Sequence, residues 1–189
     1  MQISLALFLK VVRQFIIGVM SRPKLYLFIG YPGSGKTSVA KLIKEATGAV
    51  HLWADHERLD MFGVPTHSKA ESSKLYEHLN HLTDQLLSEG KSVIFDTNFN
   101  FYNDRQYLRE IADSHGAETI IVWVNTPKEL AKKRAVDDAN LRNGYEVTMS
   151  NEQFAAIADK LEELHKNEKL IKIDGTKIDK QELMRLLKL

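Results

Sequence analysis

Residues 30–38, GYPGSGKTS, bring together small flexible residues, a lysine and hydroxyl side chains in a spacing suited to holding phosphate. They fit the pattern G-x-x-x-x-G-K-[ST], in which backbone N–H groups curl around a polyphosphate, the lysine reaches its β- and γ-phosphates and the next hydroxyl binds Mg²⁺. We therefore predict binding of ATP and Mg²⁺, with Lys36 also acting in catalysis. The predicted nucleotide ligands are Gly30, Pro32, Gly33, Ser34, Gly35, Lys36, Thr37 and Ser38, and Thr37 is also predicted to bind the metal. The alternative is a glycine-rich turn with an incidental Lys-Thr pair.

The segment SVIFDTN contains a second candidate, because its β-branched and aromatic run ends in Asp96. In open α/β sheets ligands gather at the carboxyl ends of the strands, so a carboxylate there can hold Mg²⁺ through water or orient an acceptor. We predict both roles for Asp96, with Asn98 as an acceptor-binding neighbour. The alternative for Asp96 is an aspartate that caps the turn before the next helix.

The segment HLWADHERLD carries a third candidate, since Asp55 follows a predicted strand and Arg58 lies three residues further on. Phosphoryl transfer to a hydroxyl needs a group that orients the hydroxyl and accepts its proton, and a carboxylate at a strand end can do both. We predict Asp55 as the general base and Arg58 as an acceptor-binding residue. Glu57 and Asp60 compete for the role of base, and a solvated charge run is the alternative for the whole segment.

Three further arginines complete the candidate site. The segment KKRAVDDANLR contains Arg134 and Arg142, which would supply positive charge to a transferring phosphoryl group from a flap over residues 137–150. Arg134 is predicted as catalytic and Arg142 as nucleotide-binding, although consecutive basic residues also suit an exposed basic face. Arg105, in NFNFYNDRQYL, is a predicted acceptor-binding residue, with an ordinary surface arginine as the alternative.

Short apolar runs alternate with amphipathic segments from residue 24 onward, a pattern typical of a parallel sheet covered by helices. The predicted strands are Leu25–Ile29, Ala49–Ala54, Ser92–Phe95, Thr119–Val124 and Leu170–Ile173. The predicted helices are Lys36–Thr47, Lys69–Ser88, Tyr102–His115, Pro127–Asp138, Asn151–Asn167 and Asp179–Leu187. Thr126 before Pro127, Ser150 with Gln153, and Asp179 are predicted helix-start signals.

The chain of 189 residues has 26 basic and 25 acidic residues, so any nucleic-acid site must be local. It has no cysteine, which excludes disulfides and thiolate metal sites and fits a reducing, cytoplasmic location. Residues 1–20 are strongly apolar, but Lys10 and Arg13 interrupt the run, so we predict neither a signal peptide nor an integral membrane span. This extension either forms an amphipathic helix or does not belong to the protein, whose true start would then be Met20. Residues 21–189 are predicted to form one domain.

Together these residues resemble the P-loop kinase family that includes polynucleotide 5′-hydroxyl kinase domains and zeta-toxin-like kinases, with an AAA-type ATP-binding domain. The resemblance spans about residues 24–164 and rests on G-x-P-G-S-G-K-[ST] at 30–37, D-x-x-R at 55–58 and D-T-N at 96–98. It implies an acceptor base at Asp55, acceptor binding by Arg58, a following arginine at Arg105 and a lid arginine at Arg134. His56 departs from the second aspartate that polynucleotide kinases often carry there.

The resemblance implies a three-layer α/β P-loop NTPase fold, with a mostly parallel five-stranded sheet, helices on both faces and a short lid. The expected activity is ATP-dependent phosphoryl transfer to a hydroxyl, with a polynucleotide 5′-hydroxyl favoured over a small metabolite or nucleotide sugar. The rival from another class is a nucleotide-dependent switch or binding ATPase. We expect the adenine to lie near residues 174–176, because that segment neighbours the phosphate loop in this architecture.

Overall fold

The computed structural model describes residues 22–137, 149–162 and 164–188. The predicted N-terminal extension, most of the predicted flap and Arg142 lie outside the described residues.

A five-stranded sheet forms the centre of the fold, in the order β2-β3-β1-β4-β5. Its strands are β1 (Lys24–Ile29), β2 (Val50–Trp53), β3 (Val93–Asp96), β4 (Glu118–Asn125) and β5 (Leu170–Asp174). Every neighbouring pair is parallel. All five carboxyl ends therefore lie at one edge, which we call the carboxyl edge.

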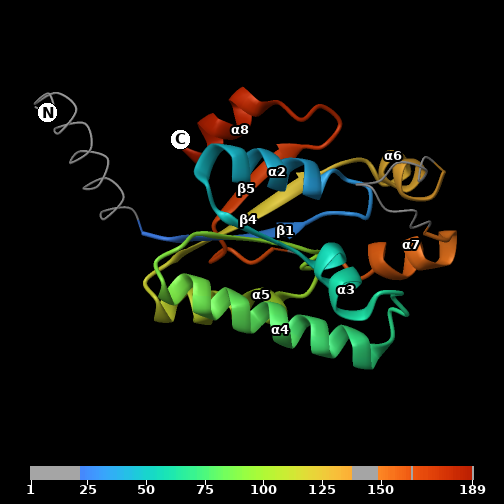
Figure 1. The fold of residues 1–189 in the computed structure, drawn as a ribbon. Coiled ribbons are helices and arrows are strands. Elements are labelled where there is room, and N and C mark those ends of the chain that lie inside the picture. Colours follow the sequence, from blue (N-terminus) through green and yellow to red (C-terminus); the bar gives the residue numbers. More distant parts are fainter. Residues whose placement is uncertain (1–21, 138–148, 163, 189) are drawn as a thin grey trace, which may run out of the picture.

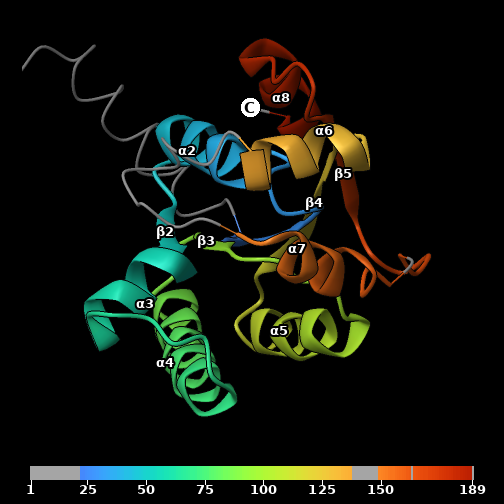
Figure 2. The ribbon, with the colours of Figure 1, turned by 90° about the vertical axis from the view of Figure 1, so that its right-hand side faces the viewer.

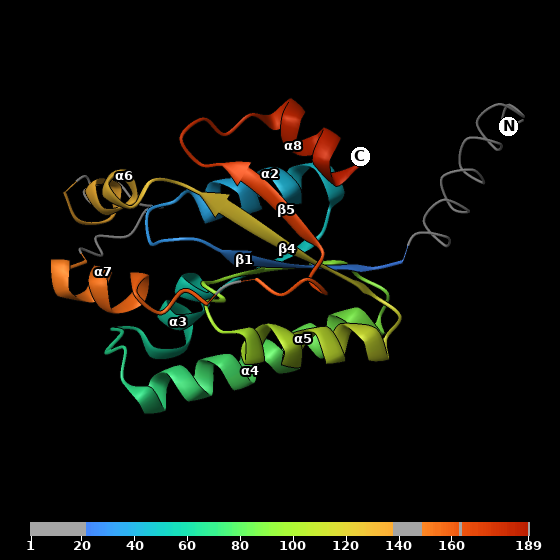
Figure 3. The same cartoon turned by 180° about the vertical axis from the view of Figure 1, so that it is seen from behind.

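Helices cover both faces of this sheet (Figures 1 and 3). Helices α2 (Lys36–Thr47) and α8 (Lys180–Leu187) lie on one face, and α4 (Lys69–Ser88) and α5 (Tyr102–Ser114) lie on the other. Helices α3 (Ala54–Phe62), α6 (Lys128–Lys132) and α7 (Asn151–Ala158) lie at the carboxyl edge (Figures 1 and 2). The parallel five-stranded sheet with helices on both faces confirms the predicted three-layer P-loop fold.

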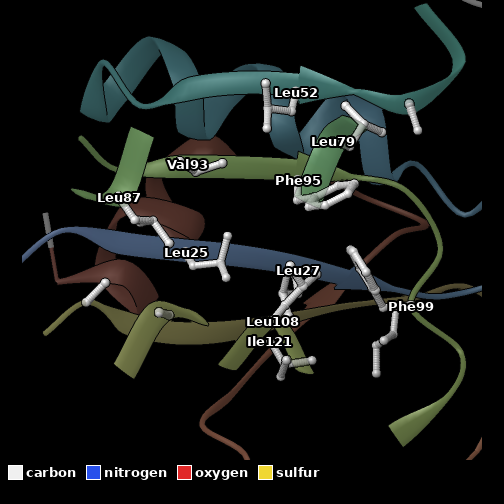
Figure 4. Packing of buried hydrophobic residues seen from close by; sticks show 14 of the residues in the cluster. Leu25, Leu27, Leu52, Leu79, Leu87, Val93, Phe95, Phe99, Leu108 and Ile121 are labelled. Atoms are coloured by element: carbon white, nitrogen blue, oxygen red, sulfur yellow. The ribbon is translucent and has the colours of Figure 1, made fainter. Parts of the chain in front are cut away.

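Two apolar cores hold the layers together, and β1 contributes to both because its side chains alternate. Leu25, Leu27 and Ile29 pack with α4 and α5, in the core shown in Figure 4. Tyr26 and Phe28 point to the other face and pack with α2 and α8. A central strand that is buried on both faces explains the continuous apolar run of its sequence.

Helix α3 was not among the predicted helices. Only Ala54 and Arg58 of this helix are buried, so the apolar periodicity that indicates a helix is missing from its sequence. The helix nevertheless begins directly after β2, and this places Asp55 in its first turn.

Helix α7 is shorter than predicted, since it ends at Ala158 rather than near Asn167. The chain that follows it is bound to the loop after β3. The backbone N–H of Glu162 donates to the carbonyl of Asn100 at 3.1 Å, and the Glu162 carboxylate accepts from the backbone N–H of Tyr102 at 2.6 Å. These long-range hydrogen bonds outweigh the local preference for a helix.

The predicted helix Pro127–Asp138 also differs, because it is α-helical only over α6 and continues as a π-helical turn, Lys133–Asp137. Single π-helical turns are frequent at functional sites. This turn contains Arg134, so the backbone at the predicted lid arginine departs from a regular helix.

Strand β1 lies at the centre of the sheet, and the chain runs from it to β2 on one side before returning to β4 on the other. The helices that follow β1 and β3, α2 and α5, consequently lie on opposite faces (Figure 1). Ligands of open α/β sheets bind at such a switch point, outside the carboxyl ends of the strands. In the part of the chain that the structure describes, no helix is long and apolar enough to span a membrane.

Candidate active site

The phosphate loop connects the end of β1 to the start of α2. Gly30 begins it with a φ of 140°, and a Cβ atom there would lie 2.6 Å from the carbonyl oxygen of Val124. Only glycine fits this position, because the loop passes directly beside β4. The loop is therefore shaped by the sheet beneath it as well as by its own sequence.

The N-terminus of α2 is suited to binding an anion. Its N-cap, Gly35, makes no side-chain capping hydrogen bond, and its first turn has no acidic residue. Helices α3, α5 and α6 also lack a side-chain cap, but each has an acidic residue in its first turn. At the starts of α4, α7 and α8, the side chains of Ser68, Ser150 and Asp179 accept backbone hydrogen bonds. Uncapped N–H groups and the helix dipole together favour a phosphate, and the residues here fit a bound polyphosphate.

Lys36 lies across this loop. Its Nζ donates to the carbonyl oxygens of Gly30 and Tyr31, at 2.9 Å each. The ammonium group is thus held at the centre of the loop, where a polyphosphate would be bound. Thr37, the next residue of α2, is half-buried, and Ser38 is exposed.

Asp55 lies in the first turn of α3, with its side chain open to solvent. The pKa of its carboxyl group is raised above the usual 3.8, first because protein displaces part of its water and second because Asp96 is negative. The positive charges of Lys36 and Arg58 act in the opposite direction. A carboxylate whose pKa is raised by partial loss of its water and by a like charge is a candidate for proton transfer. The structure thereby brings Asp55, Asp96 and Lys36 into one electrostatic cluster.

Asp96 ends β3 and is 4% exposed. Its Oδ2 accepts a hydrogen bond of 3.0 Å from Nε2 of His51, on the neighbouring strand β2. Close by in sequence, the Oδ1 atom of Asn98 is buried and has no hydrogen-bond partner within the described residues. A buried acceptor without a partner is suited to a ligand or to an ordered water.

No group of three or more His, Cys, Asp or Glu side chains within the described ranges could hold a metal ion by itself. Mg²⁺, however, usually keeps several waters and binds one or two protein groups together with substrate phosphates. Thr37, beside the loop lysine, and Asp96, at the end of the adjacent strand, are oxygen ligands of the required kind. The donor set therefore fits the predicted magnesium.

Arg58 lies on the buried side of α3 and binds α4. Its Nη1 donates to Oε1 of Glu71 at 2.6 Å, and both side chains are 7% exposed. The carboxylate of Glu71 also accepts from the backbone N–H and the hydroxyl of Thr66, at 2.7 and 2.6 Å. An anionic group of an acceptor would have to compete with Glu71 for Arg58.

The prediction that Arg105 binds the acceptor is wrong. Its side chain is completely buried, and Nε and Nη2 donate to the two oxygens of Glu168 at 2.6 and 3.0 Å. Nη1 donates to the carbonyls of Phe99 and Asn100 at 3.0 and 3.2 Å. The guanidinium joins the loop after β3 to the turn before β5 and has no surface left for a ligand.

Arg134 reaches the loop after β5. Its Nη1 donates to the carbonyl oxygen of Gly175 at 2.8 Å. Gly175 in turn lies against the phosphate loop, since a Cβ atom there would be 2.5 Å from the Ser34 carbonyl oxygen and 2.0 Å from Thr126 Oγ1. The loop after β5 therefore adjoins the phosphate loop, as expected from the sequence.

Thr126 has a different role from the predicted helix cap. The N-cap of α6 is Pro127, without a side-chain hydrogen bond, and the Thr126 hydroxyl donates to the Ser34 carbonyl at 2.9 Å. Sequence reasoning missed His51 and Glu71, neither of which carries a local signal. It included Gly175 only as part of the segment 174–176 that was expected to neighbour the phosphate loop.

A phosphate loop that leads from the central strand into the uncapped helix α2, and an aspartate with a raised pKa after β2, are features of a P-loop kinase-like domain. Comparison with protein families supports this class, since residues 25–164 match the AAA_33 family, described as an AAA domain. The chain belongs to this family of P-loop kinase domains and is an enzyme of the phosphotransferase class. A search of curated proteins found no significant match.

Solved structures share the fold. A Chloroflexus aurantiacus protein, provisionally described as a kinase, has a TM-score of 0.71 at 18% identity, over 89% of this chain and 96% of that chain. The APS kinase of Mycobacterium tuberculosis, in complex with AMPPNP and APS, has a TM-score of 0.64 at 25% identity, over 89% of this chain and 99% of that chain. A chain of the Pnkp1/Rnl/Hen1 RNA repair complex has a TM-score of 0.63 at 22% identity, over 74% of this chain and 44% of that chain.

Proposed function

We propose that this chain is an ATP- and Mg²⁺-dependent kinase that transfers the γ-phosphoryl group to a hydroxyl, with Asp55 as the general base. The observation that carries the proposal is that Lys36, Asp55 and Asp96 lie together at the carboxyl edge, after or at the ends of the neighbouring strands β1, β2 and β3. A nucleotide-binding domain that only switches has no need of a second carboxylate, Asp55, at this edge. An acceptor hydroxyl beside Asp55 would lose its proton to that carboxylate as the phosphoryl group arrives.

The nucleotide would be held by the phosphate loop. The N–H groups of the uncapped α2 terminus bind the phosphates, and Lys36 exchanges its two carbonyl partners for phosphate oxygens. Thr37 and, through water, Asp96 would hold Mg²⁺, which when bound would supply positive charge to the phosphates. The adenine would lie against the segment after β5, and Arg134, which is held on Gly175, would supply positive charge to the phosphates.

As the acceptor, we favour a small molecule that places no phosphate group next to Arg58. Arg58 is already neutralised by Glu71, and Arg105 is buried with Glu168, so two of the expected acceptor cations have carboxylate partners. Asp55, Glu57 and Asp60 add negative charge to α3. A phosphodiester next to this helix would be repelled, whereas a sugar-like hydroxyl compound would find hydrogen-bond acceptors.

A polynucleotide 5′-hydroxyl is the second candidate acceptor. It is favoured by the D-x-x-R and D-T-N motifs at residues 55–58 and 96–98. On this alternative, Arg58 leaves Glu71 when the acceptor binds.

The test supplies ATP with a labelled γ-phosphate, Mg²⁺ and two acceptor panels, one of sugars and nucleosides and one of 5′-hydroxyl oligonucleotides. Wild type should label a member of the first panel, Lys36→Ala should label nothing, and Asp55→Asn should lose label while still binding ATP. The control is Asp113→Asn, an exposed acid near the end of α5 to which no part in the site is assigned, and it should behave as wild type. If no acceptor is labelled and ATP hydrolysis survives Asp55→Asn, the protein is a switch or binding ATPase instead.

A further inference from the structure

A histidine of the edge strand β2 is built into the candidate site. Nε2 of His51 and Oδ2 of Asp96 are 3.0 Å apart, and the two side chains are 6% and 3% exposed. The strands are parallel neighbours whose register pairs Trp53 with Asp96. Because a carboxylate can only accept, Nε2 carries the hydrogen of this bond.

Neighbouring rings hold the imidazole in place. The His51 and Trp53 rings are stacked, with centroids 6.2 Å apart and planes 12° apart. Trp53 is itself packed against His56, at 5.7 Å between centroids, and Lys41 of α2 lies 5.2 Å above its ring. A histidine fixed by this packing can determine the orientation of the carboxylate that it binds.

We propose that His51 is a positioning residue for Mg²⁺-dependent phosphoryl transfer, which holds Oδ2 of Asp96 so that Oδ1 alone faces the metal-bound water. This inference rests on the proposed function, because it assigns Asp96 to the metal. Mutation of a histidine or carboxylate that orients a metal ligand in this way commonly lowers metal affinity or activity by about 10–100-fold.

The hydrogen bond also separates the two aspartates of the site by role. Asp96 is buried and has one oxygen engaged by His51, whereas Asp55 is exposed in the first turn of α3. Without His51 the Asp96 carboxylate could rotate, and either aspartate could approach the metal. His51 thus keeps the metal-binding and proton-accepting carboxylates distinct.

The test compares His51→Phe, which keeps an aromatic ring but removes the donor, with His51→Gln, which retains an N–H donor. The matched control is His115→Phe, because His115 and Asp84 form a similar pair at 2.7 Å on the surface, 24% and 52% exposed. One readout is the Mg²⁺ concentration for half-maximal transfer from ATP. The other is the Mg²⁺-dependent rise in melting temperature with the non-hydrolysable analogue AMPPNP, which requires no acceptor.

His51→Phe should raise the required Mg²⁺ about tenfold in both readouts, His51→Gln should restore part of the loss, and His115→Phe should match wild type. In an Asp96→Asn background, His51→Phe should have no further effect, because the two residues act as one unit. Unchanged Mg²⁺ dependence in His51→Phe and His51→Gln, or additive effects with Asp96→Asn, would overturn the inference. If no acceptor is ever labelled, the proposed function fails while the AMPPNP readout still decides the role of His51.

Discussion

Nη1 of Arg134 donates a hydrogen bond of 2.8 Å to the carbonyl oxygen of Gly175, which joins the π-helical turn after α6 to the loop after β5. Because Gly175 also lies against Ser34 of the phosphate loop, three segments meet at one glycine. A change at Gly175 should therefore affect both the phosphate loop and the position of Arg134.

Gly175→Ala should weaken nucleotide binding. Its new methyl group would meet Thr126 Oγ1 and the Ser34 carbonyl, so the loop after β5 must move away from the phosphate loop. Overpacking of this kind costs about 1–3 kcal/mol of unfolding free energy. Titration with a fluorescent ATP analogue should show a higher Kd, and urea unfolding a lower stability.

Gly90→Ala is the control for this change. Gly90 has a φ of 74°, and a Cβ atom there would meet nothing within 4 Å. This variant should lose about 1–2 kcal/mol through backbone strain alone and keep the wild-type Kd for the ATP analogue. Equal nucleotide affinities for the two variants would contradict the assigned role of Gly175.

Asp55→Asn should make the protein more stable and less active. The folded state raises the pKa of Asp55, so its stabilising contribution is present below the unfolded pKa and is lost as the pH rises through the folded pKa. At pH 7 the charged carboxylate therefore costs stability, and a neutral amide removes that cost. We expect a higher melting temperature together with a loss of transfer of about 10²–10⁴-fold. A lower melting temperature at pH 7 would refute this account.

Glu71 should make stability depend on acidic pH. Hydrogen bonds, first from the Thr66 hydroxyl and then from Arg58, lower its pKa from 4.5 to about 2. A depressed pKa contributes stability above the unfolded value, and this contribution is lost as the pH falls from 4.5 toward 2. Urea unfolding across this window should show a smaller loss of stability in Glu71→Gln than in wild type. Equal slopes would show that the corner between α3 and α4 does not depend on this carboxylate.

Arg105→Met should destabilise the fold by about 3–5 kcal/mol, because it removes the bidentate partner of the buried Glu168 carboxylate and leaves only Arg109, whose Nη2 lies 3.2 Å from Oε1, as a cationic partner. Burial alone raises the pKa of Glu168, but the hydrogen bonds from Arg105 and from the His165 N–H outweigh it, so the pKa is lowered. Arg105→Met with Glu168→Leu should recover much of the loss, since the fully buried carboxylate is then removed together with its partner. Chemical denaturation measures both effects, and a near-neutral Arg105→Met would contradict the assignment.

The sequence predicted most elements because their signals are local. Helices α2 and α4 begin and end where expected, at Lys36–Thr47 and Lys69–Ser88, and each strand is correct to within one residue at either end. Helix α3 was not predicted, because a buried arginine replaces an apolar residue on its inner face. The C-terminal part predicted for α7 does not form a helix, because this segment makes hydrogen bonds with residues about 60 positions earlier.

The site residues were also predictable where the signal is local and not predictable where it depends on long-range contacts. The phosphate loop is a local motif, and the approach of Asp55 to Asp96 follows from their places after neighbouring parallel strands. The fates of Arg58 and Arg105 depend on Glu71 and Glu168, which lie 13 and 63 residues away. A motif states which residue types are present, and only the fold states which carboxylate each arginine meets.

The strand order also has a consequence for synthesis of the chain. Strands β1 and β2 are made first, yet they are not neighbours, and β3 lies between them. Neither strand has any partner until Val93–Asp96 has been translated, so roughly the first half of the protein cannot begin its sheet. Because non-local pairing is slow and exposes apolar strands, this half should depend on chaperones or on its own helices until β3 emerges.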